Sequence, residues 1–234
     1  AMARRNAIVR HLPVIEALGS VTVICTDKTG TLTRNELAVT DIVTAEKSFC
    51  VTGIGYAPEG NILLDNQEIT LTEYPTVCEM GCAAMLNNDA TLKLKKDVWE
   101  ITGDPTEGAL MAFAQKTGHE RERLEEKLPR MDVIPFSAEQ RYMATLHHSA
   151  EGKGIAYIKG APEQILAMCN SQRTADGGYE KLQLDYWEAR VMELAKEGKR
   201  VLAMAHCHIA EAQDKLRHED IQEGLVLLGL FGIM

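Results

Sequence analysis

The stretch that organises this sequence runs from Val21 to Thr33 and reads VTVICTDKTGTLT. Its first residues are mostly apolar and β-branched, which predicts a buried strand that ends at Asp27. The loop after it contains Gly30 among small hydroxylated residues, and backbone N–H groups of such a loop can hold an anion. Lys28 adds a positive charge beside it, and a carboxylate at this position can attack a phosphoryl group. The residues alone leave a second interpretation open, in which Asp27 only caps the turn.

The run Cys25–Thr33 resembles the phosphorylation signature of the P-type cation-transporting ATPases. In that family the aspartate becomes an aspartyl phosphate during each transport cycle. The resemblance therefore implies that Asp27 is the catalytic nucleophile, with Lys28 beside it. It also implies ATP as the substrate and Mg²⁺ as a cofactor, with the Asp27 carboxylate and the Thr29 carbonyl among the metal ligands.

Composition limits the classes of protein that remain. The chain has 234 residues, 45% of them hydrophobic, which is enough for one large domain or two small ones. The longest apolar stretch, Leu225–Met234, is about half the roughly 20 residues that a membrane-spanning helix needs. We therefore expect no transmembrane segment and no signal peptide. Given the resemblance, we expect an excised piece on the cytoplasmic face of a membrane pump.

The net charge of −9 and the absence of a basic stripe argue against a nucleic-acid partner. Such a chain as a whole repels ATP, so a nucleotide site needs a few local cations. Six scattered cysteines are typical of reduced thiols. Two pairs of side chains could bind a metal: Cys78 and Cys82 on one face of a helix, and His206 and His208 on one face of a strand. We interpret both pairs as ordinary helix and strand residues and keep a metal site as a minor alternative.

The resemblance implies two parts. Residues 1–33 are expected to be a stalk and the edge of a phosphorylation domain of the α/β, haloacid-dehalogenase-like type. The arginine-containing residues 1–19 predict a short amphipathic helix broken near Pro13, although a solvated N-terminal helix fits equally. Residues 34–234 are expected to form the nucleotide-binding domain.

The periodicity of residues 34–234 predicts short strands and helices, and the resemblance implies that they form an α+β fold, an antiparallel sheet flanked by helices. Short strands are expected over 37–43 and 48–53, around 131–146, over 154–159, from 200, and over 225–234. Helices are expected over 77–85, from 105, from 162, over 184–196 and near 211–222, and a short, variable-looking polar stretch is expected after Asn87-Asn88-Asp89, up to Glu100.

The segment Ile101–Leu110 begins a helix. Asp104 is a suitable N-cap, Pro105 fits the first helical position, and Glu107 stands at capping-box spacing. Capping alone explains this pattern. The segment also resembles the part of the P-type nucleotide domain whose glutamate meets the adenine amino group, so the resemblance implies that Glu107 also binds the base.

Three further segments resemble the family's nucleotide pocket. Phe136 stands at a polar turn between two strands, where it can offer a ring face to a base, and Arg141 follows as a cation near the phosphates. Lys159-Gly160 ends a strand before Ala161-Pro162-Glu163, and this lysine can reach into a cleft and meet an anion. Arg200 precedes another strand and is expected near the phosphates. The alternative for each cation is a solvated surface side chain.

Three function classes remain in view. The first is the ATP-binding part of a cation pump, whose partners are ATP or ADP and the remaining phosphorylation, actuator and membrane domains of its parent chain. The second is a soluble phosphotransferase of the haloacid-dehalogenase type, which normally has a second aspartate where this chain has Thr29. The third is a nucleotide-sensing module. The Lys-Gly-Ala-Pro-Glu run and the lack of a His-Pro pair favour the calcium and sodium/potassium pumps over heavy-metal pumps.

The sequence contains no Gly-Asp-Gly-x-Asn-Asp run and no Thr-Gly-Glu-Ser run. In the family, the first supplies the second magnesium carboxylate and the second belongs to the loop that hydrolyses the phosphoenzyme. We therefore expect the chain to bind nucleotide without turnover, while its full-length parent is an enzyme.

Overall fold

The computed structural model describes residues 21–23, 25–26, 36–211 and 213–234, and the chain divides into two compact units, Ala1–Asn35 and Glu36–Met234. In the first unit, Val21–Val23 and Cys25–Thr26 are exposed and have neither helix nor strand. The strand predicted before Asp27 is therefore not found among these described residues. The predicted stalk helix, Asp27, Lys28 and Thr29 lie outside the described residues.

The second unit contains a large, almost entirely antiparallel sheet, which confirms the α+β prediction. Within the described residues it has 11 strands, of which nine follow the order β4-β3-β2-β1-β13-β12-β9-β8-β7. The exception to antiparallel pairing is β10, which runs parallel to β13 and pairs with β11 on its other side. The strands are β1 (Val39–Val43), β2 (Ser48–Val51), β3 (Ile62–Leu64), β4 (Gln67–Glu68), β7 (Arg130–Ile134), β8 (Tyr142–His148), β9 (Gly154–Gly160), β10 (Cys169–Arg173), β11 (Tyr179–Lys181), β12 (Arg200–Ile209) and β13 (Leu225–Ile233).

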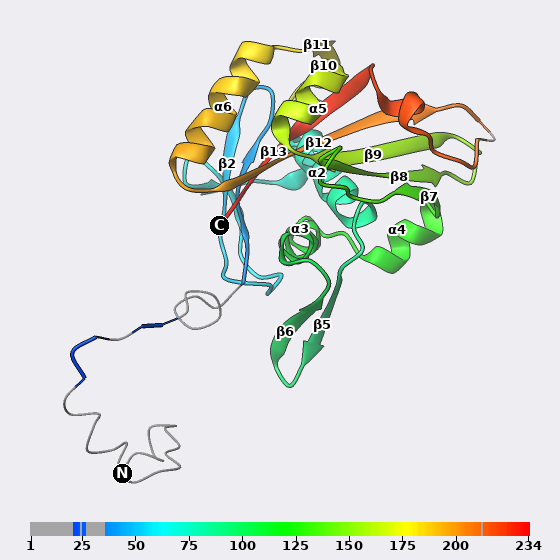
Figure 1. The fold of residues 1–234 in the computed structure, drawn as a ribbon. Coiled ribbons are helices and arrows are strands. Elements are labelled where there is room, and N and C mark those ends of the chain that lie inside the picture. The colour runs from blue at the N-terminus through cyan, green and yellow to red at the C-terminus, as the bar shows by residue number, and fades with distance from the viewer. Residues whose placement is uncertain (1–20, 24, 27–35, 212) are drawn as a thin grey trace. The chain divides into compact units, whose positions relative to one another are not determined.

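Helices cover both faces of this sheet (Figure 1). The helices α2 (Pro75–Leu86) and α3 (Pro105–Lys116) pack on one face, with α4 (Arg121–Lys127) beside α2. The helices α5 (Pro162–Met168) and α6 (Leu184–Lys196) pack on the other. The central strands are therefore apolar on both sides, and two hydrophobic cores form, one on each face.

A β-bulge in β13 changes which positions of the strand face each core. The register with β12 shifts between Met204 and Ala205, which leaves Leu228 without an opposite residue. Leu227 and Leu230 consequently lie in the same core, although regular alternation would place residues at this spacing on opposite faces. Gly229 follows at a close approach, because a Cβ there would lie 2.3 Å from the Val43 carbonyl oxygen.

The structure differs from the sequence interpretation in two places. The variable-looking polar stretch up to Glu100, for which no element was predicted, contains a hairpin of β5 (Thr91–Lys95) and β6 (Val98–Thr102), which extends away from the main sheet beside α3 (Figure 1). Its two-residue turn, Lys96-Asp97, has positive φ at both positions, as a type I′ turn requires. The alternation of apolar and charged residues was the available signal.

The helix expected near 211–222 is reduced to the 3₁₀ turn η4 (His218–Ile221) in the described residues; a second such turn, η3 (Leu71–Glu73), precedes α2. Side chains satisfy the backbone there in place of helical bonds. Asp132 accepts a hydrogen bond from the Leu216 N–H, and Asp220 accepts one from the Arg217 N–H. Such side-chain to backbone bonds compete with helix formation.

Candidate functional site

A cavity of about 710 Å³ opens where β8, β9 and β12 meet the start of α3. Each of the six residues that the sequence predicted for nucleotide binding lines it. The full lining consists of Asp89, Asp104, Thr106, Glu107, Leu110, Phe136, Arg141, Met143, Lys159, Gly160, Ala161, Pro162, Glu163, Arg200, Val201 and Leu202. A volume of this size lies within the roughly 300–1,000 Å³ typical of small-molecule sites.

The first turn of α3 forms one wall of this cavity. The Asp104 carboxylate accepts hydrogen bonds from the N–H groups of Thr106 and Glu107, at 2.8 and 3.3 Å, so the predicted N-cap is confirmed. The cap fixes the direction in which the helix begins. The Glu107 side chain is consequently held at the cavity, while the apolar residues after it enter the core.

Lys159 and Glu107 form a buried ion pair at the cavity wall. The Lys159 ammonium lies 2.6 Å from Glu107 Oε1 and 2.5 Å from the Asn87 carbonyl oxygen. The two side chains are 9% and 15% exposed, so water screens the pair little. Burial lowers the pKa of Lys159, and the Glu107 carboxylate opposes that shift. The anion that Lys159 meets within the protein is therefore Glu107.

Phe136 and Arg141 stand on the loop that joins β7 to β8. Phe136 is 64% exposed although it is aromatic, so the hydrophobic cores do not account for its position. Arg141 has a φ of 57°, which is uncommon for a residue other than glycine. Its guanidinium lies 2.6 Å from Glu163 on α5. The loop thus places an exposed ring and a cation at the same cavity.

Gly160 is required by backbone packing. A Cβ at this position would lie 2.4 Å from the Arg141 carbonyl oxygen, which also accepts the N–H of Ala161. Any side chain here would push β8 away from the end of β9. Gly160 therefore lets the loop carrying Arg141 approach Lys159, and it lines the cavity through its backbone.

Arg200 begins β12 and also lines the cavity. Its guanidinium donates to the Thr106 hydroxyl at 2.7 Å. In the described part of the chain it has no carboxylate within ion-pair distance, in contrast to Lys159 and Arg141. Arg200 is therefore the cavity cation whose charge is least neutralised by neighbouring side chains.

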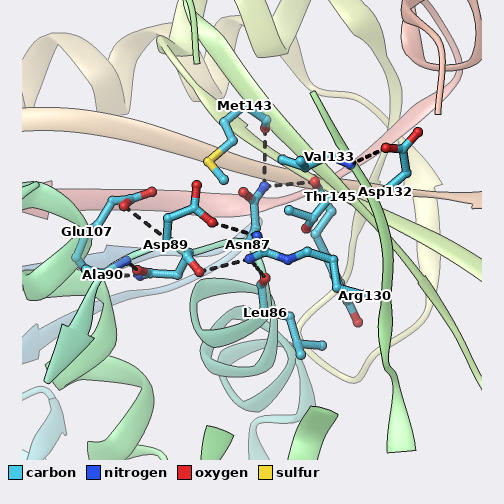
Figure 2. A network of polar contacts seen from close by, with 12 residues as sticks. Leu86, Asn87, Asp89, Ala90, Glu107, Arg130, Asp132, Val133, Met143 and Thr145 are labelled. Carbon is cyan, nitrogen blue, oxygen red and sulfur yellow. Dashed lines mark hydrogen bonds and ion pairs between the residues drawn. The ribbon is translucent and has the colours of Figure 1, made fainter. Parts of the chain in front are cut away.

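Asp89 is a lining residue that the sequence analysis missed. Its carboxylate accepts from Arg130 at 2.6 Å, and its N–H donates to Glu107 Oε2 at 3.3 Å (Figure 2). Asp89 stands in a polar turn after α2, and no motif marks it. Its position follows from the packing of α2 against α3.

The residues considered for metal binding do not assemble into a site. Among the described residues, no group of three His, Cys, Asp or Glu side chains could hold a metal ion. Cys78 instead contacts His119, and Cys82 contacts Tyr157. The predicted Mg²⁺ ligands, Asp27 and Thr29, are not among the described residues, so their role stays a prediction.

Comparison with known proteins identifies the family. The model of the P-type ATPase cytoplasmic domain N matches residues 77–234, which is more than half of the chain. This chain belongs to the P-type ATPases. Membership in the N-domain family implies ATP binding, and the match favours the pump class over the soluble phosphotransferase and the nucleotide sensor.

Individual relatives of this P-type ATPase chain agree. It is 41% identical to the cation-transporting ATPase pma1 of Synechocystis sp., over all of this chain and 26% of that protein. It is 32% identical to a calcium-transporting ATPase of Bacillus subtilis, over all of this chain and 26% of that protein. It is 35% identical to the human calcium-transporting ATPase type 2C member 1, over 87% of this chain and 22% of that protein. The chain therefore spans about a quarter of the length of the relatives that it matches.

No helix among the described residues is both long enough and apolar enough to cross a membrane.

Proposed function

We propose that this P-type ATPase domain binds ATP in the cavity described above, and that it serves a longer parent chain that couples ATP hydrolysis to cation transport. The main support for the proposal is that residues from separate parts of the sequence line the same cavity. Four segments far apart in the sequence bring an exposed aromatic ring, a paired carboxylate and three cations to one cavity. These groups match the parts of ATP: a base with two ring faces, an exocyclic amine and a chain of phosphates.

The Glu107–Lys159 pair suits adenine better than guanine. Adenine presents an amine donor and a ring-nitrogen acceptor side by side, while guanine presents an oxygen acceptor and an N–H donor in those places. A carboxylate only accepts hydrogen bonds and an ammonium only donates them. We therefore assign Glu107 to the adenine amine, with Lys159 beside it and the exposed Phe136 ring stacked on the base.

Arg200 and Arg141 then remain for the phosphates. Arg200 is the stronger candidate because no carboxylate neutralises it in the described part of the chain. Arg141 can exchange its exposed pair with Glu163 for a phosphate oxygen, at small cost because exposed ion pairs contribute about 0–1 kcal/mol. Gly160 contributes by allowing the close approach of the Arg141 backbone.

For the parent pump, the motif around Asp27 supports phosphoryl transfer. The Asp27 carboxylate would attack the γ-phosphorus, and the bond from that phosphorus to the bridging oxygen would break, so that an aspartyl phosphate forms and ADP leaves. Lys28 lies next to the nucleophile in sequence and supplies a positive charge. Mg²⁺, with Asp27 and Thr29 as proposed ligands, would neutralise phosphate charge. The actuator and membrane domains of the parent are the proposed partners, at the cytoplasmic face of a membrane.

Calorimetric titration of this chain with ATP, ADP and GTP tests the binding proposal. We expect ATP and ADP to bind and GTP to bind much more weakly, since guanine places like groups opposite Glu107 and Lys159. Equal affinity for ATP and GTP would contradict the assignment of this pair to the base. No measurable binding of any of the three nucleotides would refute the proposed function.

A further inference from the structure

The turn after α2 is held by an unusual number of side chains. Asn87 and Asn88 are fully buried, and their backbone carbonyls accept hydrogen bonds from cations. Lys159 binds the Asn87 carbonyl, and Arg130 binds the carbonyls of Leu86 and Asn88 at 2.9 Å each. Arg121 also donates to the Asn88 carbonyl. Cations at the C-terminal end of a helix are favoured by the helix dipole, so α2 and these three side chains stabilise one another.

The same turn is connected to both sides of the cavity. The Asn87 amide donates to the carbonyls of Met143 on β8 and Tyr157 on β9, at 3.2 and 2.8 Å. The Asn88 amide donates to the Glu107 backbone carbonyl at 2.9 Å. A displacement of this turn therefore moves the first turn of α3 relative to the sheet.

Arg130 contacts this turn from outside the cavity. One terminal nitrogen of its guanidinium lies 2.6 Å from the Asp89 carboxylate. The other donates to the backbone carbonyls of Leu86 and Asn88. Asp89 in turn donates its backbone N–H to Glu107 Oε2 at 3.3 Å. Figure 2 shows this sequence of contacts, from Arg130 through Asp89 to Glu107.

We propose that Arg130, acting through Asp89, is a positioning residue for adenine recognition: it holds the Asp89 N–H on one Glu107 oxygen while Lys159 holds the other. The carboxylate is then bound from two directions and cannot rotate freely. Each of its oxygens keeps a further lone pair, so an adenine amine can still be accepted. This inference rests on the proposed function, because it assigns Arg130 a role only if Glu107 reads the base.

The arrangement explains why a planar guanidinium stands at position 130. Arginine can donate to the Asp89 carboxylate and to two backbone carbonyls at once, in a fixed geometry. Arg130 does not line the cavity. Its effect on nucleotide binding must therefore pass through Asp89 and Glu107 rather than through a contact with ATP.

The test compares Arg130→Gln with Arg123→Gln, which changes an exposed arginine on α4 that pairs with Glu120. Affinities are measured for ATP and for purine riboside triphosphate, which is ATP without its 6-amino group. We expect Arg130→Gln to weaken ATP by about threefold to tenfold, the effect of one misplaced hydrogen bond, and to leave the analogue nearly unchanged. Arg123→Gln should change neither affinity.

A double-mutant cycle separates positioning from general stability. In a Glu107→Gln background, Arg130→Gln should no longer alter the ratio of the ATP and analogue affinities. Thermal unfolding identifies any variant that does not fold. If Arg130→Gln is one of these, Asp89→Asn replaces it, because it removes the same ion pair at its more exposed residue.

The two proposals can fail separately. Wild-type protein that binds ATP and the analogue equally would refute base reading by Glu107. If the wild type prefers ATP to the analogue, and Arg130→Gln or Asp89→Asn keeps the same preference, then the positioning role alone is refuted.

Discussion

Replacing Phe136 with alanine should separate nucleotide binding from folding. The Phe136 side chain is 64% exposed, so its removal takes little apolar surface out of the folded protein. We expect the free energy of unfolding to change by no more than about 0.5 kcal/mol, as for other surface substitutions. This distinguishes Phe136 from Phe113, which is 1% exposed and packs edge-on against Phe231.

The loss in binding should be much larger. Stacking of a base on an aromatic side chain contributes about 1–3 kcal/mol, which corresponds to a roughly fivefold to 150-fold weaker affinity for ATP. The loss should be the same for ATP and adenosine, because the ring contacts the base and not the phosphates.

Calorimetric titration and urea unfolding of the same preparations measure both quantities. Tyr179→Ala is a suitable control, since Tyr179 is also an exposed aromatic residue, at 56%, but lies on β11 outside the cavity. If Phe136→Ala bound ATP as tightly as the wild type, Phe136 would not stack on the base. If it lost as much stability as a core substitution does, Phe136 would serve the fold instead.

Three further predictions concern charge and chemistry. Arg200→Gln should weaken the binding of ATP more than that of adenosine and reduce the salt dependence of ATP binding. The control Arg190→Gln on α6 should do neither. Equal losses of affinity for ATP and adenosine would show that Arg200 does not contact the phosphates. Burial lowers the pKa of His147 and of His206 from 6.5 to about 4, so the unfolded chain binds protons more readily than the folded one. The free energy of unfolding should therefore keep this contribution above pH 6.5 and fall by up to about 3 kcal/mol per histidine as the pH drops toward 4. Urea unfolding of His147→Gln should show a smaller fall than that of the wild type. A fall of the same size in both proteins would show that His147 does not contribute to it. Finally, this chain alone should transfer no phosphate to Asp27 from γ-labelled ATP, and a hydroxylamine-sensitive label that disappears in Asp27→Asn would contradict this prediction.

Local sequence signals were sufficient for most of the elements. The N-cap Asp104 followed by Pro105 predicted the start of α3, a run of apolar and small residues predicted α2, and an amphipathic pattern predicted α6. These features depend on residues within one or two turns of each other, so a single stretch contains the information. The same holds for the turn that carries Phe136 between β7 and β8.

Local signals failed where partners from elsewhere in the chain decide the structure. The helix expected near 211–222 is reduced to the turn η4 in the described residues, where Asp132 accepts the Leu216 N–H in place of a helical bond. The stretch before Asp27 has the composition of a strand, but its described residues are exposed and form none. The hairpin of β5 and β6 is a different case, because it was missed although its alternation of apolar and charged residues and its two-residue turn are both local signals.

The sequence by itself determined which residue types this domain brings to a nucleotide: an aromatic ring, a glutamate and three cations, each marked by a local motif. Only the tertiary structure decided how they are paired. Lys159 and Glu107 are 52 residues apart, and their pairing follows from the approach of the end of β9 to the start of α3. Arg130 and Asp89 are 41 residues apart and meet because β7 passes the C-terminal end of α2. A sequence motif records which groups are present, whereas the distances between groups on different elements are set by the packing of those elements around two shared cores.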